Sequence, residues 1–361
     1  MSRLGVVLTT LVLTASGGVA CAAVGDAPAP AGAASERHAD RRADRRADAV
    51  TDSVVAISLD GFNPPALRRL GRSGTPNLHR IIKQGASTLN ARTEQEMTIT
   101  LPNHTGMVTG RRIEAATGGH GVTWNDDRMV PATVQAAAGG PVDSVFTVVD
   151  QAGLSSGFFA SKTKFSLWDR SWPDATDTQT IIEDNDALVR SFKTDLLSQP
   201  RAFRLLHLSE TDAVGHAKGF MGKAYLRAVR RADRRVGAVI RAIKQNPAQT
   251  GRTTVIITAD HGGKGFANGG HGDPTKAHNY TVPFLVWGSG AQAGTDLYDL
   301  NPDYTDPGRS RPGYTGAQPV RNGDVANLAL DLLGLGAVPG SEHDVQQDLD
   351  VSSVEVTAPR A

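Results

Sequence analysis

The chain has 361 residues, of which 39% are hydrophobic and 21% are charged, and its formal net charge is +1. This is the balance of an ordinary globular protein, and it excludes a whole-chain electrostatic attraction to nucleic acid. Cys21 is the single cysteine, so the chain has no cysteine pair for an internal disulfide.

The first 23 residues are predicted to be an export signal. A basic residue precedes an apolar stretch over residues 4–13, which is too short to span a membrane, and small residues follow it. Two processing routes are open: cleavage after Ala22 or Ala23, or lipidation of Cys21 as the first residue of a lipoprotein. The protein is therefore expected to be exported, and either secreted or anchored to the outer face of the cell membrane. No other apolar run is long enough for a transmembrane segment.

Residues 24–50 are predicted to be a disordered linker. They are rich in Ala and Pro and then repeat the letters ADRR, so the segment has no apolar face to bury. Residues 51–345 are expected to form one catalytic domain, and residues 346–361 a C-terminal tail.

From residue 51 onward, apolar β-branched runs alternate with amphipathic helical patterns. Strands are predicted at residues 53–61, 155–161, 202–210, 253–263 and 282–290. Helices are predicted at residues 223–246 and 322–335. Several of the strands are apolar on both faces, as strands of a covered parallel sheet are. The pattern predicts an α/β fold with a doubly wound, mostly parallel central sheet flanked by helices.

Acidic and imidazole side chains stand where three of these strands end. Asp60 closes the first strand, Asp212 and His216 follow the strand at 202–210, and Asp260 and His261 follow the strand at 253–258. Ligands in such folds bind outside the carboxyl ends of the strands, so we expect these side chains to meet at one edge of the sheet.

The glycine-rich loop after Asp260 offers two more histidines. His271 and His278 are both candidates for an additional ligand, and the residues alone leave the choice open. Mixed histidine and carboxylate ligands favour Zn²⁺, with Mn²⁺ or Fe as alternatives. The candidate ligands are too many for one catalytic ion, so two ions about 4 Å apart are predicted.

A run of hydroxyl residues before Pro102 supplies candidates for a nucleophile. Thr98 and Thr100 are the choices on chemistry alone, because a threonine bound to a dication can lose its proton and attack phosphorus. If a helix begins here, its free N–H groups would face a bound phosphate. A threonine that serves only as a helix cap is the alternative.

Seven motifs in order resemble the alkaline phosphatase superfamily, and most closely its type I phosphodiesterase/nucleotide pyrophosphatase family. They are AISLDGF, TPNLHRIIKQGA, TITLPNHTGMVTGRR, HGVTWND, ETDAVGH, TADHGG and GGHGD followed by VPFLVWG. They extend over residues 53–335, almost the whole expected domain.

The resemblance implies a role for each matching residue. The family's nucleophile, which also binds a metal ion, falls on Thr100, and Asn103 matches an asparagine that holds a phosphate oxygen. The ligands of the ion that activates the nucleophile fall on Asp60, Asp260 and His261. The ligands of the second ion fall on Asp212, His216 and His271, which favours His271 over His278.

Three further residues match substrate-binding positions. Asn125 matches an asparagine near the family's site, and Lys162 and Lys164 resemble a lysine pair that phosphonoacetate hydrolases of the superfamily use on substrate. The chain lacks large insertions that would recognise a nucleotide base, and it lacks the CxPxR motif of sulfatases.

The sequence therefore predicts an exported two-metal phosphoesterase that cleaves phosphodiesters or pyrophosphates through a phosphothreonine on Thr100. Its partner would be a small phosphoester substrate, without specific nucleic-acid binding. One alternative is a phosphonate or phosphomonoester hydrolase of the same superfamily. The other is a non-catalytic metal-binding protein of the cell envelope.

Overall fold

The computed structural model describes residues 51–353. The predicted export signal at 1–23 and the predicted linker at 24–50 lie outside the described residues, as does the end of the chain from residue 354. Within the described part, no helix is both long enough and apolar enough to cross a lipid bilayer.

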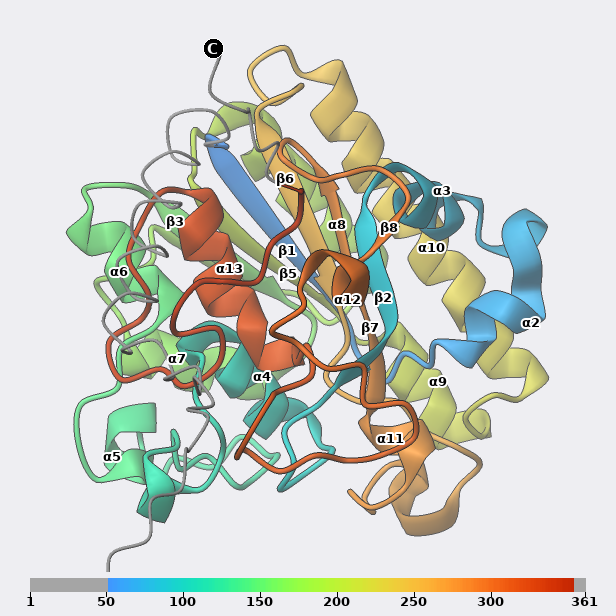
Figure 1. Cartoon of the computed structure of the whole chain (residues 1–361). Helices are drawn as coiled ribbons and strands as arrows, with labels where there is room; N and C mark the ends of the chain where they lie inside the picture. The colour runs from blue at the N-terminus through green and yellow to red at the C-terminus, as the bar shows by residue number, and fades with distance from the viewer. Residues whose placement is uncertain (1–50, 354–361) are drawn as a thin grey trace, which may run out of the picture. The chain divides into compact units, whose positions relative to one another are not determined.

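One eight-stranded sheet runs through the domain (Figure 1). Its strands are β1 (Ser53–Leu59), β2 (Ala86–Arg92), β3 (Ser156–Ala160), β4 (Thr178–Ile181), β5 (Phe203–Leu208), β6 (Thr253–Thr258), β7 (Thr281–Gly288) and β8 (Thr295–Asp296). The order across the sheet is β4-β3-β5-β1-β6-β7-β2-β8. The strands from β4 to β6 are parallel, whereas β7 is antiparallel to both of its neighbours, β6 and β2.

Helices cover both faces of the sheet. The α-helices are α2 (Pro65–Gly74), α3 (Pro76–Gln84), α4 (Thr100–Thr109), α5 (Val134–Ala138), α6 (Val145–Gln151), α7 (Ser166–Ser171), α8 (Asn185–Ser198), α9 (Glu210–Lys218), α10 (Lys223–Gln245), α11 (Ala277–Tyr280), α12 (Leu297–Leu300) and α13 (Val325–Leu332). Short 3-10 helices are η1 (Ala115–Thr117), η2 (Thr163–Phe165), η3 (Ala267–Gly270) and η4 (Asn322–Asp324).

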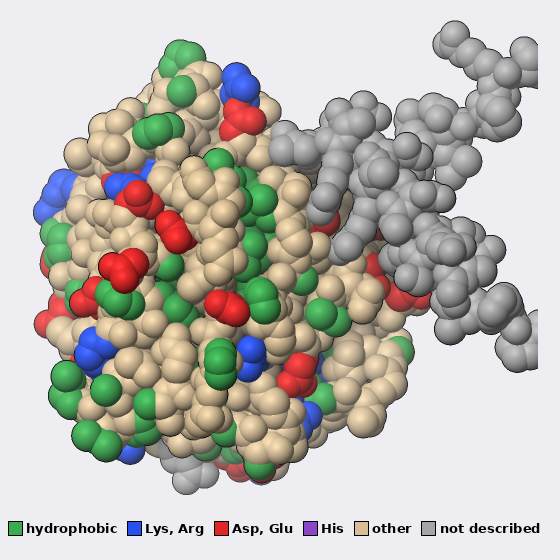
Figure 2. All heavy atoms as spheres, turned by 90° about the vertical axis from the view of Figure 1, so that its left-hand side faces the viewer, with side chains coloured by type: hydrophobic (Ala, Val, Ile, Leu, Met, Phe, Trp, Pro, Cys, Tyr) green, Lys and Arg blue, Asp and Glu red, His purple; other side chains and the backbone are tan. Residues whose placement is uncertain are grey.

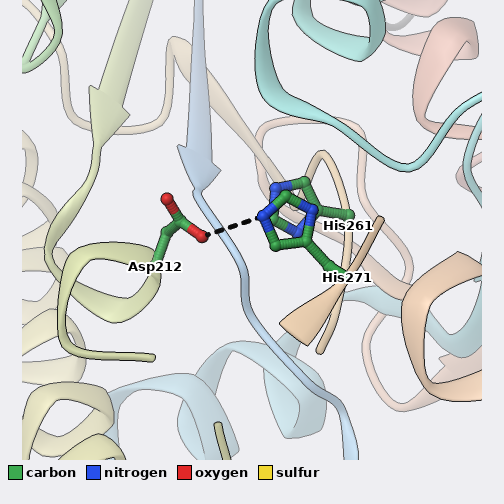
Figure 3. A group of neighbouring side chains, drawn as sticks. All are labelled: Asp212, His261 and His271. Atoms are coloured by element: carbon green, nitrogen blue, oxygen red, sulfur yellow. Dashed lines mark ion pairs between the residues drawn. The ribbon is translucent and has the colours of Figure 1, made fainter. Parts of the chain in front are cut away.

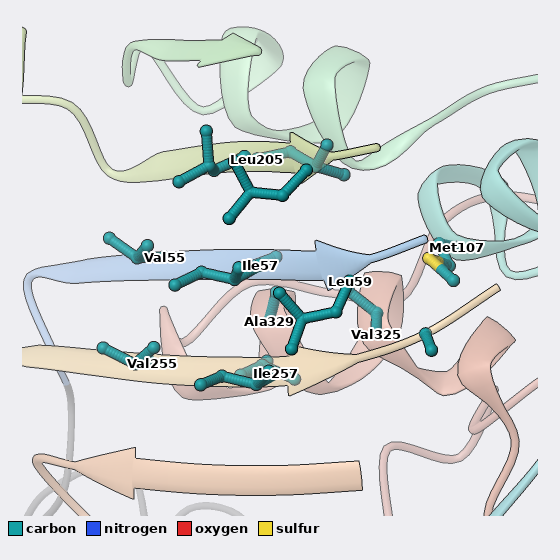
Figure 4. Close-up of a cluster of buried hydrophobic side chains, with 14 of the residues drawn as sticks. Val55, Ile57, Leu59, Met107, Leu205, Val255, Ile257, Val325 and Ala329 are labelled. Atoms are coloured by element: carbon teal, nitrogen blue, oxygen red, sulfur yellow. The ribbon is translucent and has the colours of Figure 1, made fainter. Parts of the chain in front are cut away.

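The two helical layers explain why the central strands are apolar throughout. Helices α4, α6 and α13 pack together on one face, and α3, α8 and α10 on the other (Figure 1). Every residue of β1, β5 and β6 is buried, because neither face of these strands meets water. In Figure 4, Val55 and Ile57 of β1 share a core cluster with Val325 and Ala329 of α13.

The long helix α10 shows the expected amphipathic pattern. Its buried positions recur at helical spacing, and Val229, Val236 and Ile243 are among them. The outward face is basic, and the exposed arginines on it are Arg227, Arg230, Arg234 and Arg241. Arg235 is instead buried and forms ion pairs with Asp186 and Glu210. The face of the domain formed by the elements at the left of Figure 1 mixes charges of both signs with small apolar patches (Figure 2).

The doubly wound, mostly parallel α/β prediction is confirmed, with additions. Strands β2, β4 and β8 were not predicted, because β2 (ASTLNAR) and β4 (TQTI) are only partly apolar and β8 has two residues. The packed domain also continues beyond residue 345, where a tail was expected, since Leu349 and Val351 are buried in the core.

Candidate metal centre

Three neighbouring strands bring the predicted ligands to one edge of the sheet. Asp60 follows β1, Asp212 lies in α9 just after β5, and Asp260 follows β6. In the sheet, β1 lies between β5 and β6. Gly61, with φ of 66°, permits the close approach, because a Cβ there would meet Asp212 Cα and Cβ at 3.0 Å. The centre thus arises from the parallel pairing of β5, β1 and β6.

Asp60, Asp260 and His261 form a first group of ligands. Their ligand atoms lie within 4.8 Å of one another, and all three side chains are fully buried. His261 Nδ1 lies 2.8 Å from the carbonyl oxygen of Gly262. A carbonyl can only accept, so Nδ1 carries the hydrogen and Nε2 presents its lone pair to the two carboxylates.

Asp212 and His271 form a second group, to which His216 is joined. The ligand atoms of Asp212, His261 and His271 also lie within 4.8 Å of one another, and Figure 3 shows Asp212 directed at the two imidazoles. The Nε2 atoms of His216 and His271 are 3.0 Å apart, and His216 Nε2 is 3.2 Å from Asp212 Oδ1. The rings of His261 and His271 are stacked, with their centroids 3.6 Å apart, so the first and second groups of ligands are in direct contact.

The structure separates the two candidate histidines of the glycine-rich loop. His271 lies inside the second group and is 4% exposed. His278 lies on the short helix α11, half-buried, and belongs to neither group of ligands in the described residues.

The unpartnered atoms of these side chains fit metal ions. Asp60 Oδ1, Asp212 Oδ1, Asp260 Oδ2 and His261 Nε2 are all buried and have no hydrogen-bond partner. A buried polar atom without a partner costs on the order of 1–3 kcal/mol, and a charged one costs more. Cations would satisfy all four atoms, and the mixed donor set of carboxylate and imidazole is one that zinc accepts.

Lys162 lies between the two groups. Its ammonium Nζ is 2.6 Å from Asp60 Oδ2, 2.8 Å from Asp212 Oδ2 and 3.3 Å from Thr100 Oγ1. Burial alone would lower the pKa of this ammonium, but Asp60 and Asp212 raise it above the usual value of lysine. In this arrangement the ammonium is positively charged and contacts one carboxylate of each group.

The carboxylates respond differently to this arrangement. Burial alone would raise the pKa of Asp60, but Lys162 and His207 hold it well below the usual range. Burial and the neighbouring charge of Asp60 raise the pKa of Asp260 well above its usual value. Burial, followed by the charge of His271, lowers the pKa of His261 to about 3, so its imidazole is neutral at pH 7.

Of the two candidate threonines, Thr100 faces this centre. It is the first residue of α4 and contacts Lys162, whereas the hydroxyl of Thr98 donates to the backbone carbonyl of His271. Asn125 reaches the same helix terminus, where its Oδ1 accepts from the N–H of Leu101 at 3.0 Å.

Asn103 is placed differently from the role that the resemblance implied. Its side chain is fully buried, its Oδ1 accepts from the N–H of Glu94 at 3.0 Å, and its Nδ2 donates to the carbonyls of Met97 and Ile99. All of these bonds hold the segment that leads into α4. Lys164 donates to the backbone carbonyl of Asn125 at 2.6 Å.

Two buried histidines under the centre were not predicted. His207 lies within β5, where its Nδ1 accepts from the N–H of Ser161 and its Nε2–H donates to Asp60 Oδ2 at 2.9 Å. His104 follows Asn103 in α4, and its Nε2 accepts from Ser58 at 2.7 Å. For His207, the sequence feature that could have been noticed is a histidine within an otherwise apolar strand, RLLHLSE. In the sheet, His207 pairs with Ser58, the residue before the end of β1.

Residues 54–272 match the family described as type I phosphodiesterase/nucleotide pyrophosphatase. Among curated proteins, GPI ethanolamine phosphate transferase 1 of Chaetomium globosum is 29% identical over 197 residues, which is 54% of this chain and 19% of that protein. The protein of the same name from Neurospora crassa is 27% identical over 66% of this chain and 23% of its own length. The chain spans about a fifth of the length of these relatives.

Two solved structures show the likeness of the fold. Murine ectonucleotide pyrophosphatase/phosphodiesterase 5, as an inactive variant in complex with AMP, superimposes with a TM-score of 0.60 at 15% identity, over 82% of this chain and 99% of that chain. A protein of the alkaline phosphatase superfamily from Vibrio parahaemolyticus has a TM-score of 0.53 at 12% identity, over 82% and 70% of the two chains.

Proposed function

Because this chain belongs to the type I phosphodiesterase/nucleotide pyrophosphatase family, we propose that it hydrolyses phosphodiester or pyrophosphate bonds as a two-metal phosphoesterase. One observation carries the proposal. Thr100, at the start of α4, contacts the same ammonium group that joins the carboxylates of Asp60 and Asp212, and ligand atoms of both groups are buried without partners.

The two groups of side chains divide the ligands in this proposal. Asp60, Asp260 and His261, with Thr100, would hold one ion, and Asp212, His216 and His271 would hold the other. The proposed ions are divalent cations, with zinc preferred over manganese or iron. When bound, they supply positive charge that activates a hydroxyl and stabilises the attacking and leaving oxygens of an in-line displacement.

Thr100 is the nucleophile of the proposed reaction. Its Oγ1 gives up its proton to solvent and forms a bond to phosphorus as the bond from phosphorus to the leaving oxygen breaks. This releases the leaving group and leaves a phosphothreonine on the protein. Lys162 donates a hydrogen bond to Thr100 Oγ1 from 3.3 Å, and as a charged group it stabilises negative charge on that oxygen. A water molecule then hydrolyses the phosphothreonine.

The start of α4 and Asn125 orient the phosphate. The positive end of the helix dipole points to the substrate, and Asn125 places its carboxamide at the first turn of the helix. Pro102 has no N–H, the N–H of Asn103 donates to Ile99, and the N–H of Leu101 donates to Asn125 Oδ1. Of the first four residues of the helix, only Thr100 therefore keeps an N–H for an anion. We propose the cell exterior as the place of reaction, on the basis of the signal pattern in residues 1–23.

Transfer to an acceptor other than water is a second candidate function. It is favoured by the curated relatives, which carry the name GPI ethanolamine phosphate transferase 1 and match up to 66% of this chain. In that case an acceptor hydroxyl, rather than water, would attack the phosphothreonine.

A substrate panel on metal-stripped and zinc-loaded protein tests the proposal. We expect zinc-dependent release of nitrophenol from bis(p-nitrophenyl) phosphate at a higher rate than from p-nitrophenyl phosphate, and little turnover of phosphonoacetate. A faster monoester or phosphonoacetate reaction would replace the diester assignment, and no zinc-dependent turnover of any phosphoester would overturn the proposal. Phosphoglycerol product in the presence of glycerol would favour the transferase.

A further inference from the structure

We propose that Thr98 is a positioning residue that fixes the orientation of His271 for metal binding. This inference rests on the proposed two-metal function. His271 needs such support because it lies in a glycine-rich loop. Gly269 and Gly270, immediately before it, have φ of 68° and 88°, in the left-handed region that gives the backbone its sharp turn. The ring of His261 stacks on this imidazole, but within the described residues its hydrogen-bonding contacts are to Thr98 and His216, which lie outside the loop.

Thr98 provides two reciprocal hydrogen bonds to His271. The Thr98 hydroxyl donates to the backbone carbonyl of His271 at 2.5 Å, and His271 Nδ1 donates to the backbone carbonyl of Thr98 at 2.6 Å. The two residues are 1% and 4% exposed, so water does not compete for these bonds. The hydroxyl fixes the backbone of the loop while the carbonyl fixes the ring.

The second bond also determines which nitrogen of His271 is free. A carbonyl oxygen can only accept, so Nδ1 carries the hydrogen and Nε2 keeps its lone pair. Nε2 is the atom that lies 3.0 Å from His216 Nε2 and 3.6 Å from Asp212 Oδ1. Thr98 therefore presents the ligating nitrogen of His271 to the rest of the second group.

The segment that carries Thr98 is itself held in place. Asn103 donates to the carbonyls of Met97 and Ile99, on either side of Thr98, from its position in the first turn of α4. Thr98 thus links the helix that begins with Thr100 to the loop that carries His271. Partners of this kind, which orient a metal ligand without touching the metal, change metal affinity by about 10–100-fold when they are removed.

Zinc titration of Thr98→Val against Thr98→Ser separates positioning from a purely structural role. Val keeps the size of the side chain and removes the hydroxyl, whereas Ser keeps the hydroxyl. Zinc affinity is measured by competition with a chromophoric chelator. Thr98→Val should bind one of its two zinc ions about 10–100-fold more weakly than wild type, and the other with an affinity within about twofold of wild type. Thr98→Ser should bind both ions with near wild-type affinity. The matched control is Thr109→Val on α4, a buried threonine whose hydroxyl donates to the carbonyl of Thr105.

Two results distinguish this inference from the function on which it rests. Thr98→Val with wild-type affinity for both ions overturns the positioning role and leaves the two-metal centre standing. Wild-type protein that binds no zinc overturns both. A role limited to folding would lower the affinity for both ions together, or would lower the melting temperature with no change in either.

A measurement on wild-type protein tests the same inference if Thr98→Val does not fold. In the ¹⁵N NMR spectrum of the zinc-loaded protein, the imidazole of His271, assigned by its loss in His271→Gln, should be the tautomer with hydrogen on Nδ1. Hydrogen on Nε2 would contradict the proposed orientation.

Discussion

The ammonium group of Lys162 lies 3.3 Å from the hydroxyl oxygen of Thr100. The same ammonium is 2.6 Å from Asp60 Oδ2 and 2.8 Å from Asp212 Oδ2. One side chain therefore contacts the proposed nucleophile and a carboxylate from each group of ligands. This position fits a cation that stabilises negative charge on the oxygen of Thr100 while the threonine attacks phosphorus.

Replacing Lys162 by Met should lower kcat far more than it changes KM. The loss should be about 10²–10³-fold, because one hydrogen-bond donor to the developing charge is removed. Steady-state kinetics of zinc-loaded protein on bis(p-nitrophenyl) phosphate measures the effect. Lys83→Met, at an exposed lysine of α3, is the control for the loss of a charge. A kcat within threefold of wild type would remove Lys162 from the mechanism.

Replacing Asn103 should mainly lower the stability of the protein, whereas replacing Asn125 should mainly lower its activity. Asn103→Ala removes bonds to Glu94, Met97 and Ile99 within a buried segment, and should lower the free energy of unfolding by about 2–4 kcal/mol. Asn125→Ala removes a half-buried carboxamide at the start of α4 and should lower kcat/KM with little change in stability. Urea unfolding and steady-state kinetics of both variants decide the matter. The reverse pattern would restore a substrate role to Asn103.

His207 should support the first group of ligands through Asp60. Removing its Nε2–H bond to Asp60 Oδ2 should weaken zinc binding by about 10–100-fold, measured by chelator competition on His207→Ala. His120→Ala is the matched control, because His120 is equally buried and its Nδ1 accepts from the N–H of Val122. Equal loss of zinc in the two variants would mean that removing a buried imidazole, rather than the bond to Asp60, causes the change.

Asp324 should make stability depend on pH below neutrality. Burial raises the pKa of this carboxyl from 3.8 to about 7, so the folded protein holds its proton between about pH 4 and pH 7 while the unfolded chain has lost it. The proton therefore favours the folded state at low pH, and its contribution is lost as the pH rises toward 7. The full contribution is at most about 4 kcal/mol.

The free energy of unfolding of wild type, relative to Asp324→Asn, should therefore fall between pH 4 and pH 7. Asn keeps an acceptor for the N–H of Arg321, which Asp324 Oδ2 accepts at 2.7 Å. Asp150→Asn, at an exposed carboxylate of α6, controls for the loss of a charge. A difference between wild type and Asp324→Asn that does not change with pH would contradict the account.

The sheet and the meeting of its strand ends could be predicted from the sequence for a physical reason. Strands buried on both faces have an apolar pattern that needs no tertiary information, and parallel strands place their carboxyl ends at one edge. The sequence alone therefore predicts that Asp60, Asp212 and Asp260 lie close together. Strands β2 and β4 could not, because they are only partly apolar and are held by their neighbours in the sheet.

The direction of individual side chains could not be predicted in the same way. Asn103 stands at the position that the resemblance linked to phosphate, yet its amide bonds to the backbone before α4. His207 had no partner in the sequence pattern until the pairing of β1 with β5 placed it beside Asp60. Hydrogen-bond partners far apart in the chain depend on the packed fold, and spacing along one segment does not contain them.

The most direct test of the central claim is to trap the phosphorylated enzyme. Zinc-loaded wild type, mixed with bis(p-nitrophenyl) phosphate and quenched in acid within its first turnovers, should yield a peptide with a phosphoryl or nitrophenyl-phosphoryl group on Thr100 by mass spectrometry. Thr100→Ala should bind zinc, form no such adduct and lose turnover. Full turnover by Thr100→Ala, or an adduct on another residue, would contradict the account.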